Sequence, residues 1–486
     1  MRLLSWIVCL ATLSGCAVGP DFHPPAAPGI SSYGVPTPVT ASSSAPGGQA
    51  QRFAAGHEVQ GDWWRSFGSV SINELVAQAL AASPDLEAAR AALRAAQETL
   101  AAQRATLLPT LGLQLSSLRE HDSATLSPTL ANGTQSFNLH TAQLTLAYPL
   151  DLFGGERRQI EAVAANTDAQ RWQLAATYLN LTSNTVIAAI NAAAAQSELA
   201  LAHQVADGAQ QSLAILRHQY QLGALAQTDI DAQQAAFSQA LALVPSLQQQ
   251  RQQQLDLLAA LTGKLPAQWA EQAVADRLTL DTLMLPEVLP LSLPASVVER
   301  RPDIRMAEAQ LHAATAQLGV AIANMLPNIS LTANAGSAAL ALSQLAAPES
   351  RFWSLGASLS QILFTGGALE HRKRAAVATL DQAAAQYRSS VLQAFRQIAD
   401  ALAAVQADAA TLQAQSEAAN AAARTLQSTQ HDLQSGAASE LALLDAERTY
   451  RQAVLAQAAA RAARLVDAVN LYAALGGGLD PSGRVR

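Results

Sequence analysis

The stretch Leu108-Pro-Thr-Leu-Gly-Leu-Gln-Leu-Ser116 is the most informative guide to the fold of this chain. Within it, Leu111, Leu113 and Leu115 alternate with small or polar residues, and this period of two is typical of a β-strand whose two faces meet different surroundings. A second stretch, Leu326-Pro-Asn-Ile-Ser-Leu-Thr-Ala-Asn334, has the same leading Leu-Pro and the same alternation. Both follow long alanine-rich segments that the proline ends, because proline cannot continue a helix. The chain therefore combines long helices with short, two-faced strands.

The sequence around these stretches is duplicated, since six short matches occur in the same order in both halves. Each half predicts a helix, two strands, a long helix and a further helix. We expect strands at about 108–118 and 137–148 in the first copy and at about 327–336 and 352–362 in the second. The matches are Ser83-Pro84-Asp85 with Arg301-Pro302-Asp303, Leu108-Pro109 with Leu326-Pro327, Gly154-Gly155 with Gly366-Gly367, Gly223-Ala224 with Gly436-Ala437, Asp231-Ala232-Gln233 with Asp445-Ala446-Glu447, and Ala260-Leu261-Thr262-Gly263 with Ala474-Leu475-Gly476-Gly477.

Four strands allow two interpretations. They can form soluble hairpins packed on helices, or they can belong to a barrel in an outer membrane. Barrel strands need about 9 to 11 residues with apolar and polar faces, and the smallest closed barrels have about eight strands. Four strands cannot close alone, so a barrel would be shared between subunits, and three copies would supply twelve strands.

Composition excludes several classes of protein. The chain has 486 residues, of which 50% are hydrophobic and 14% charged, so it is not a disordered protein. A net charge of −7 provides no basic face, and we expect no nucleic-acid partner. The two cysteines, Cys9 and Cys16, lie at the extreme N-terminus, so the body has no disulfide framework and no cysteine metal site.

The first residues predict export. Arg2 precedes an apolar run from Leu3 to Leu13, which has the length of a signal-peptide core and is too short to span a bilayer. Leu13-Ser-Gly-Cys16 resembles a bacterial lipobox, so we expect removal of residues 1–15 and attachment of a lipid to Cys16. A plain secretory signal with a chance cysteine is the alternative. No later segment is expected to cross a membrane as a helix.

The long helices predict coiled-coil packing. No proline occurs between Gly155 and Leu222, and apolar residues recur every four and three residues from Leu174 to Tyr220 with Thr185 as the single break. A less strict seam extends from Tyr387 to Leu433. A period near 3.5 indicates coiled-coil packing. The seams alone fit an antiparallel rod as well as a helical tunnel wall, and the strands and lipid anchor favour the tunnel.

With these parts, the chain resembles the TolC-type outer membrane efflux proteins, specifically the lipoprotein branch that works with resistance-nodulation-division pumps. The resemblance covers nearly all of the mature chain. It rests on Cys16-Ala-Val-Gly-Pro-Asp-Phe22, Asp62-Trp-Trp-Arg-Ser-Phe67, Glu299-Arg-Arg-Pro-Asp-Ile304, and Val469-Asn-Leu-Tyr472 followed by Leu475-Gly-Gly-Gly478.

The resemblance implies a mixed α/β membrane protein, mainly α. It implies a homotrimer with a twelve-stranded barrel in the cell outer membrane, a twelve-helix periplasmic tunnel and an equatorial belt. Ala17, in place of an inner-membrane retention aspartate, implies sorting to the outer membrane. The implied partners are a periplasmic adaptor (membrane fusion) protein and an inner-membrane resistance-nodulation-division pump, with drugs or other small toxic compounds as cargo. No cofactor is expected beyond the lipid on Cys16.

The expected organisation has six parts. Pro266, Pro286, Pro290 and Pro294 predict a non-helical connector between the copies. The parts are a signal peptide (1–15), a lipidated N-terminal segment that joins the belt (16–72), repeat 1 (73–263), the equatorial connector (264–295), repeat 2 (296–478) and a C-terminal tail (479–486).

The resemblance also places a gate at the periplasmic tip. It implies that Leu441 is a hydrophobic plug, Asp445 an acidic constriction and Arg448 its partner. Steps of four and three residues can place all three on one helix face, and three-fold symmetry would make each a ring. The alternative is a solvated surface pair. In the first copy, Thr228, Asp229 and Asp231 are expected to bond to the neighbouring helix and hold the tip shut.

No catalytic motif is present: Gly263-Lys264 lacks the other residues of a phosphate loop, and His57-Glu58 lacks the second histidine of a zinc helix. The sequence therefore predicts an outer-membrane channel of a tripartite efflux pump and not an enzyme. The alternatives are a lipid-anchored periplasmic coiled-coil scaffold and a type I protein secretion duct.

Overall fold

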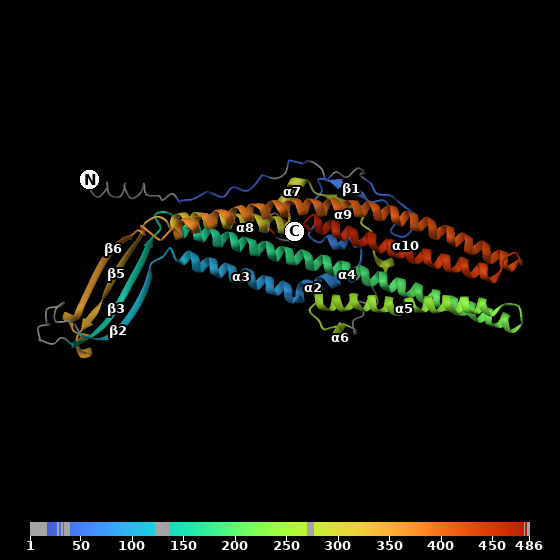
Figure 1. Ribbon diagram of the computed structural model, residues 1–486, viewed down its shortest axis with the longest axis horizontal. Coiled ribbons are helices and arrows are strands. Elements are labelled where there is room, and N and C mark those ends of the chain that lie inside the picture. Colours follow the sequence, from blue (N-terminus) through green and yellow to red (C-terminus); the bar gives the residue numbers. More distant parts are fainter. Residues whose placement is uncertain are drawn as a thin grey trace. The chain divides into compact units, whose positions relative to one another are not determined.

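A computed structural model describes residues 17–26, 29–30, 33, 39–121, 136–269, 277–480 and 482–483 (Figure 1). Cys16 and the predicted signal peptide lie outside these residues. Contacts divide the chain into two compact units. Unit 1 comprises Met1–Pro25, Leu93–Gln170 and Ala307–Tyr387, and unit 2 comprises Ala26–Ala92, Arg171–Met306 and Arg388–Arg486. Each unit draws on both sequence copies, so the copies pack against each other within each unit.

The two copies contain the same elements in the same order. The equivalent long helices have equal lengths, with 22, 67 and 35 residues in each copy. The first copy contains α2 (Val70–Ala82), α3 (Pro84–Ala105), β2 (Thr110–His121), β3 (Ser136–Leu150), α4 (Gly155–Gln221) and α5 (Gln227–Leu261). The second contains α7 (Pro294–Arg300), α8 (Pro302–Ala323), β5 (Asn328–Ala339), β6 (Arg351–Ser360), α9 (Ala368–Gln434) and α10 (Glu440–Ala474).

The strands of unit 1 form one antiparallel sheet in the order β2-β3-β5-β6 (Figure 1). Its central pair, β3 with β5, joins the two copies. The register pairs Leu113 with Leu144, and Leu144 with Ala335. Strands β2 and β6 are the two edges, and neither edge is paired along its free side within the described chain.

Because side chains alternate along a strand, this register separates the sheet into two chemically different faces. The polar face carries cross-strand hydrogen bonds such as Gln143 Nε2 to Gln114 Oε1 at 2.9 Å. The apolar face carries Leu111, Leu113, Leu115, Leu144, Leu146, Ile329, Leu331, Leu355 and Leu359. Several of these leucines are about 70% exposed in the single chain, which a water-facing surface would not favour.

The helical seams are buried largely as predicted. In α4, the seam is buried or half-buried as far as Leu216, and Tyr220 at its end is exposed. Thr185, the predicted break, is fully buried and donates its hydroxyl to the Leu181 carbonyl at 2.7 Å. In α9, Ile398 occupies the equivalent position and is fully buried. A threonine is tolerated in the seam because its own helix satisfies its hydroxyl.

Contrary to the expectation from the sequence, one helix among the described residues, α4, is long and apolar enough to cross a membrane. Within α4, one 18-residue window has the hydropathy of a membrane span, and 56% of that window is buried inside the protein. This burial is explained by helix packing, because the alanines of α4 face neighbouring helices.

Unit 2 contains an aromatic core and a small sheet that the sequence did not predict. Trp63 stacks on Tyr472 with ring centroids 5.3 Å apart, and Phe67 is fully buried beside them. The strand β1 (Arg52–Ala55) pairs in parallel with β4 (Val288–Leu291), so the N-terminal segment and the connector between the copies lie together.

The prediction of a non-helical connector is wrong in part. Pro266 begins the short helix α6 (Pro266–Trp269), and Pro294 begins α7. Proline is favoured in the first helical turn, where its missing N–H has no partner to lose. Pro290 lies within β4 and Pro286 precedes it.

Candidate functional site

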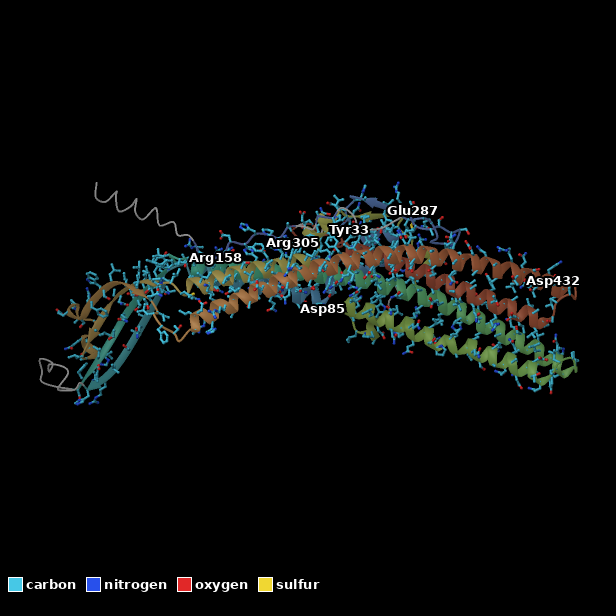
Figure 2. The ribbon with its side chains drawn as sticks, turned by 45° about the horizontal axis from the view of Figure 1, so that its top comes forward. Tyr33, Asp85, Arg158, Glu287, Arg305 and Asp432 are labelled. Atoms are coloured by element: carbon cyan, nitrogen blue, oxygen red, sulfur yellow. The ribbon has the colours of Figure 1, made fainter. Side chains whose placement is uncertain are left out.

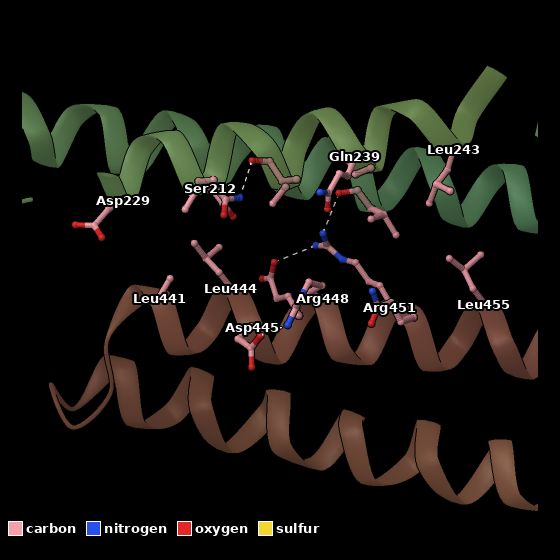
Figure 3. Close-up of a pocket in the computed structure, with 18 residues that line it drawn as sticks. Ser212, Asp229, Gln239, Leu243, Leu441, Leu444, Asp445, Arg448, Arg451 and Leu455 are labelled. Atoms are coloured by element: carbon pink, nitrogen blue, oxygen red, sulfur yellow. Dashed lines mark hydrogen bonds and ion pairs between the residues drawn. The ribbon is translucent and has the colours of Figure 1, made fainter. Parts of the chain in front are cut away.

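The first turns of α10 line a cavity of about 460 Å³ together with α4 and α5, all within unit 2 (Figure 3). The three predicted gate residues, Leu441, Asp445 and Arg448, all line it. Asp229 of α5 and Ser212 of α4 lie on its opposite wall. The structure thus brings the three predicted gate residues of the second copy together with Asp229 of the first.

Helix α10 begins where Ser439 caps it, accepting a hydrogen bond from the Ala442 amide at 3.2 Å. The cap fixes the phase of the helix, so that Leu441, Asp445 and Arg448 follow at steps of four and three residues. The Arg448 Nη2 and Asp445 Oδ1 atoms are 2.5 Å apart. All three side chains are more than 60% exposed, so they are available to groups outside this chain.

The first-copy residues bond within their own helix. The Asp229 carboxylate accepts from the Ala226 amide at 3.2 Å, and Asp231 accepts from Gln227 Nε2 at 3.0 Å. Thr228 is exposed. Within this chain, the described hydrogen bonds of Asp229 and Asp231 therefore stabilise the start of α5 and do not cross to another helix. Asp231 and Thr228 do not line the cavity.

The structure also corrects the alignment of the two copies. Helices α5 and α10 have 35 residues each, and counting from their first residues makes Ala232, not Asp231, equivalent to Asp445. Ala232 lines the cavity. The Asp-Ala-Gln and Asp-Ala-Glu match is thus displaced by one residue relative to the helices.

Arg451, which was not predicted from the sequence, ties α10 to α4 beside the predicted gate residues. Arg451 donates through Nη1 to the Val205 carbonyl at 3.2 Å and through Nη2 to Glu447 Oε2 at 3.1 Å. A Cβ on Gly208 would lie 2.1 Å from the Arg451 guanidinium, so a larger residue at this position would displace that side chain. A lone glycine inside a long helix was the available signal, since it often marks close packing.

A second site of interest lies in unit 1, where the N-terminal segment is bound to α4 by Arg158 (Figure 2). The Arg158 side chain is buried and bonds Asp21 Oδ1 and Glu161 Oε2, each at 2.7 Å. It also donates to the Val18 carbonyl at 3.1 Å. The Arg158 guanidinium holds the pKa of Asp21 below its usual value, first by hydrogen bonding and then by its charge.

Aromatic and backbone contacts complete this attachment. Phe22 stacks on His312 with centroids 4.3 Å apart. Gly19 lies against Gly319, where a Cβ would meet the backbone at 2.6 Å. Ala17 lies against Gly154 at the turn between β3 and α4. The residue after Cys16 is thus held beside the strand-to-helix junction.

A third buried polar cluster holds a different part of the N-terminal segment in unit 2. Arg464 of α10 is almost fully buried and donates to the carbonyls of Gly47 and Gln49 at 2.8 and 2.9 Å. Burial, and then the charge of Asp467, raise the pKa of the nearby Asp408 to about 6, while Arg464 opposes this shift. No group of three or more potential metal-binding side chains occurs among the described residues.

Comparison with known proteins identifies the family. The model of the outer membrane efflux protein family matches residues 75–264 and again residues 293–477. The chain belongs to this family. The double match reflects the duplication seen in the sequence and in the paired helix lengths.

Curated relatives align with this outer membrane efflux protein over almost its whole length. OpmQ, a pyoverdine export outer membrane protein of Pseudomonas aeruginosa, is 30% identical over 451 residues, covering 91% of this chain and 93% of OpmQ. TtgC, a toluene efflux pump outer membrane protein of Pseudomonas putida, is 30% identical over 481 residues, covering 98% of this chain and 95% of TtgC.

Solved structures show the same fold. The outer-membrane channel OprN superimposes with a TM-score of 0.84 at 29% identity, covering 95% of this chain and 99% of OprN. The open state of the Neisseria gonorrhoeae channel MtrE gives a TM-score of 0.80 at 25% identity, covering 95% and 98%. The predicted fold class of joined α- and β-barrels is confirmed.

These findings confirm the predicted function and location. The protein is an outer-membrane channel of an efflux system with a periplasmic extension. Channels of this family are trimers that work with adaptor proteins and inner-membrane pumps, and the family is one of transport components and not a known enzyme class. These findings therefore rule out the alternative of a lipid-anchored periplasmic coiled-coil scaffold. The two-faced sheet with open edges is the part of each subunit that a trimer closes into a barrel.

Proposed function

We propose that this channel conducts small toxic organic compounds without catalysing a reaction, and that Leu441, Asp445 and Arg448 form its periplasmic constriction. The exposed row of these side chains on one wall of the α10 cavity carries the proposal. In a trimer, three copies of each side chain would face a common axis. Hydrophobic constrictions and rings of charged side chains both narrow pores in channel proteins.

The Asp445 and Arg448 pair is suited to a reversible constriction. The two groups are bonded to each other and are more than 60% exposed, so little free energy of folding depends on them. By contrast, Arg451 is held to α4 and Glu447 and would keep the helix in place when the gate side chains move. The residues that would move are thereby separated from the residue that holds the helix.

The nature of the cargo follows from the relatives. OpmQ is named for pyoverdine export and TtgC for toluene efflux, and a further relative, ArpC, for antibiotic efflux. All three cargoes are small compounds, which supports a small-molecule channel over the protein-secretion duct. The polar face of the sheet, with Gln114, Gln143 and Asn334, would supply a wetted wall.

We also propose that Cys16 carries a lipid and that the Arg158 cluster aligns this anchor with the barrel. Cys16 precedes Ala17, which lies at the β3 to α4 turn, and the Asp21 and Phe22 contacts fix the chain that follows. Incorporation of labelled fatty acid into the protein should be lost in Cys16→Ser, while trimer formation should persist. Labelling that survives this substitution would contradict the assignment.

Single-channel recording in a planar bilayer tests the gate. We expect Asp445→Ala and Arg448→Ala to raise the conductance, because each removes one half of the pair that narrows the pore. Asp400→Ala is the matched control, since Asp400 forms an equally exposed ion pair with Arg396 on α9, away from the α10 cavity. Equal conductance of wild type, Asp445→Ala and Asp400→Ala would contradict the assignment of the constriction to these residues.

A further inference from the structure

The strand ends that are farthest along the chain from the long helices carry arginine and histidine side chains that neither the proposed gate nor the cargo path uses. Arg119 and His121 end β2, His140 lies in the early part of β3, and Arg351 begins β6. We call these four side chains the basic row. The opposite end of each strand leads directly to a long helix, from α3 into β2 and from β6 into α9.

The register places the basic row on the apolar face. Arg119 and His121 are an even number of residues from Leu115, and His140 is four residues from Leu144. Leu115 and Leu144 belong to that face, and side chains an even number of residues apart share a face. Arg351 is two residues from Trp353. Trp353 pairs with Ala335, which pairs in turn with Leu144, so Arg351 also lies on the apolar face. The apolar rows of β2, β3 and β6 therefore end in nitrogen-bearing side chains.

Neither arginine of this row has an acidic partner among the described residues. None of the ion pairs between described residues involves Arg119 or Arg351, and Glu120 lies on the opposite face of β2. His121 and His140 bond Ser136 and Ser117 through Nδ1 at 2.6 and 2.9 Å. A hydroxyl can donate or accept, so the second nitrogen of each imidazole stays available to another ligand.

We propose that the basic row binds the phosphate-bearing headgroups of lipids in the outer leaflet. This inference rests on the placement of the sheet in the outer membrane, with the helices in the periplasm. The apolar face would contact the acyl chains, and the basic row lies where that face ends. Trp353, 80% exposed beside Arg351, is the kind of residue that occupies a membrane interface. Guanidinium groups bind phosphate in a two-pronged geometry, and basic side chains are attracted to anionic lipid surfaces.

Two copies of the chain would complete each binding site. Arg119 is on edge strand β2 and Arg351 on the opposite edge strand, β6. When a barrel closes, β6 of one copy becomes the neighbour of β2 of the next, and the two strands are antiparallel with their far ends together. One headgroup can then lie between Arg351 of one copy and Arg119 of the next, whereas an isolated chain presents half-sites.

Lipid binding to the purified trimer tests the proposal. The trimer in a neutral detergent is titrated with bis-phosphorylated lipid A, its monophosphorylated form and phosphatidylcholine, and bound lipid is counted by native mass spectrometry. We expect affinity to increase with the number of phosphates on lipid A. Arg119→Gln with Arg351→Gln should weaken binding of the bis-phosphorylated lipid by about fivefold for each arginine removed from a site. Lysine at both positions should give an intermediate loss, because it keeps the charge without the planar fork.

The matched control replaces two other exposed arginines, Arg90→Gln with Arg424→Gln, which lie on α3 and α9 and not on the sheet. If both double variants reduced lipid binding equally, or if inorganic phosphate fully displaced the bound lipid, the proposal would be overturned. Conductance recorded on the same preparations keeps this test separate from the gate. The basic-row variant should conduct as wild type does, so a failure of the gate prediction would leave the lipid result standing.

Discussion

The two helical hairpins, α4 with α5 and α9 with α10, have equal lengths but different chemistry at equivalent positions. Counting from the first residue of each helix, alanine in the first hairpin corresponds to a polar residue in the second at three informative positions. The pairs are Ala195 with Asp408, Ala226 with Ser439, and Ala232 with Asp445. The two hairpins thus share their geometry, and the second carries a helix cap, a half-buried acid and a proposed gate charge where the first has alanine. Three pairs of substitutions, one in each hairpin, test this difference.

The largest effect is expected at a position where both hairpins are equally buried. Ile398 and its equivalent Thr185 are both fully buried in their seams. Ile398→Ala leaves a cavity and should lower the free energy of unfolding around α9 by about 2 to 5 kcal/mol, measured by hydrogen exchange of the α9 amides. Thr185→Val should change α4 little, because the threonine hydroxyl bonds only its own helix. Gln393→Ala changes an exposed residue of α9 and is the control. A similar loss of stability in this variant would contradict the importance of seam burial in α9.

The second effect depends on pH. The pKa of Asp408 is raised to about 6 from an ordinary value of 3.8, so the folded chain binds a proton more tightly than the unfolded chain between these values. This carboxyl therefore reduces stability as pH rises from about 4 to 6, and the cost persists above 6. Asp408→Asn should remove it and gain about 1 to 2 kcal/mol at pH 8, after allowance for partial solvent exposure.

Thermal unfolding of wild type and Asp408→Asn across pH 4 to 8 measures this gain. The exposed acid Glu417 on the same helix supplies the control, and Glu417→Gln should leave the pH profile unchanged. The reciprocal change, Ala195→Asp, should introduce a pH-dependent loss in the first hairpin. If the stability of wild type and of Asp408→Asn changed with pH in the same way, burial would not perturb the pKa of this carboxyl.

The smallest effect concerns the helix caps. Ser439 caps α10 through its hydroxyl, whereas Ala226 has no side-chain acceptor at the start of α5, where Asp229 bonds the Ala226 amide instead. Ser439→Ala should weaken the first turn of α10 by about 1 kcal/mol, seen as faster exchange of the Ala442 amide. Ala226→Ser should slow exchange at the start of α5. If neither rate changes, the caps do not account for the difference between the two tips.

Much of this architecture was predictable because it depends on local periodicity. The alternation at Leu111 to Leu115 predicted strands, the 3.5-residue seam predicted packed helices, and repeated Leu-Pro and Gly pairs revealed the duplication. The face shared by Leu441, Asp445 and Arg448 also followed from helical spacing. The β1 to β4 pairing was missed because it joins Arg52 to Val288, and such distant short strands have no periodic signal.

The sequence alone was enough to predict the long helices, the four long strands and which face of each is apolar, since these depend on the chemistry of neighbours within a few residues. Which elements meet, by contrast, depends on packing between distant parts of the chain. The tertiary structure brought Asp21 to Arg158 and Asp408 near Arg464, aligned Ala232 with Asp445, and set the register that ends the apolar face in Arg119 and Arg351. Such contacts join residues far apart in the chain, and their energies depend on burial and on partners that a linear pattern does not contain.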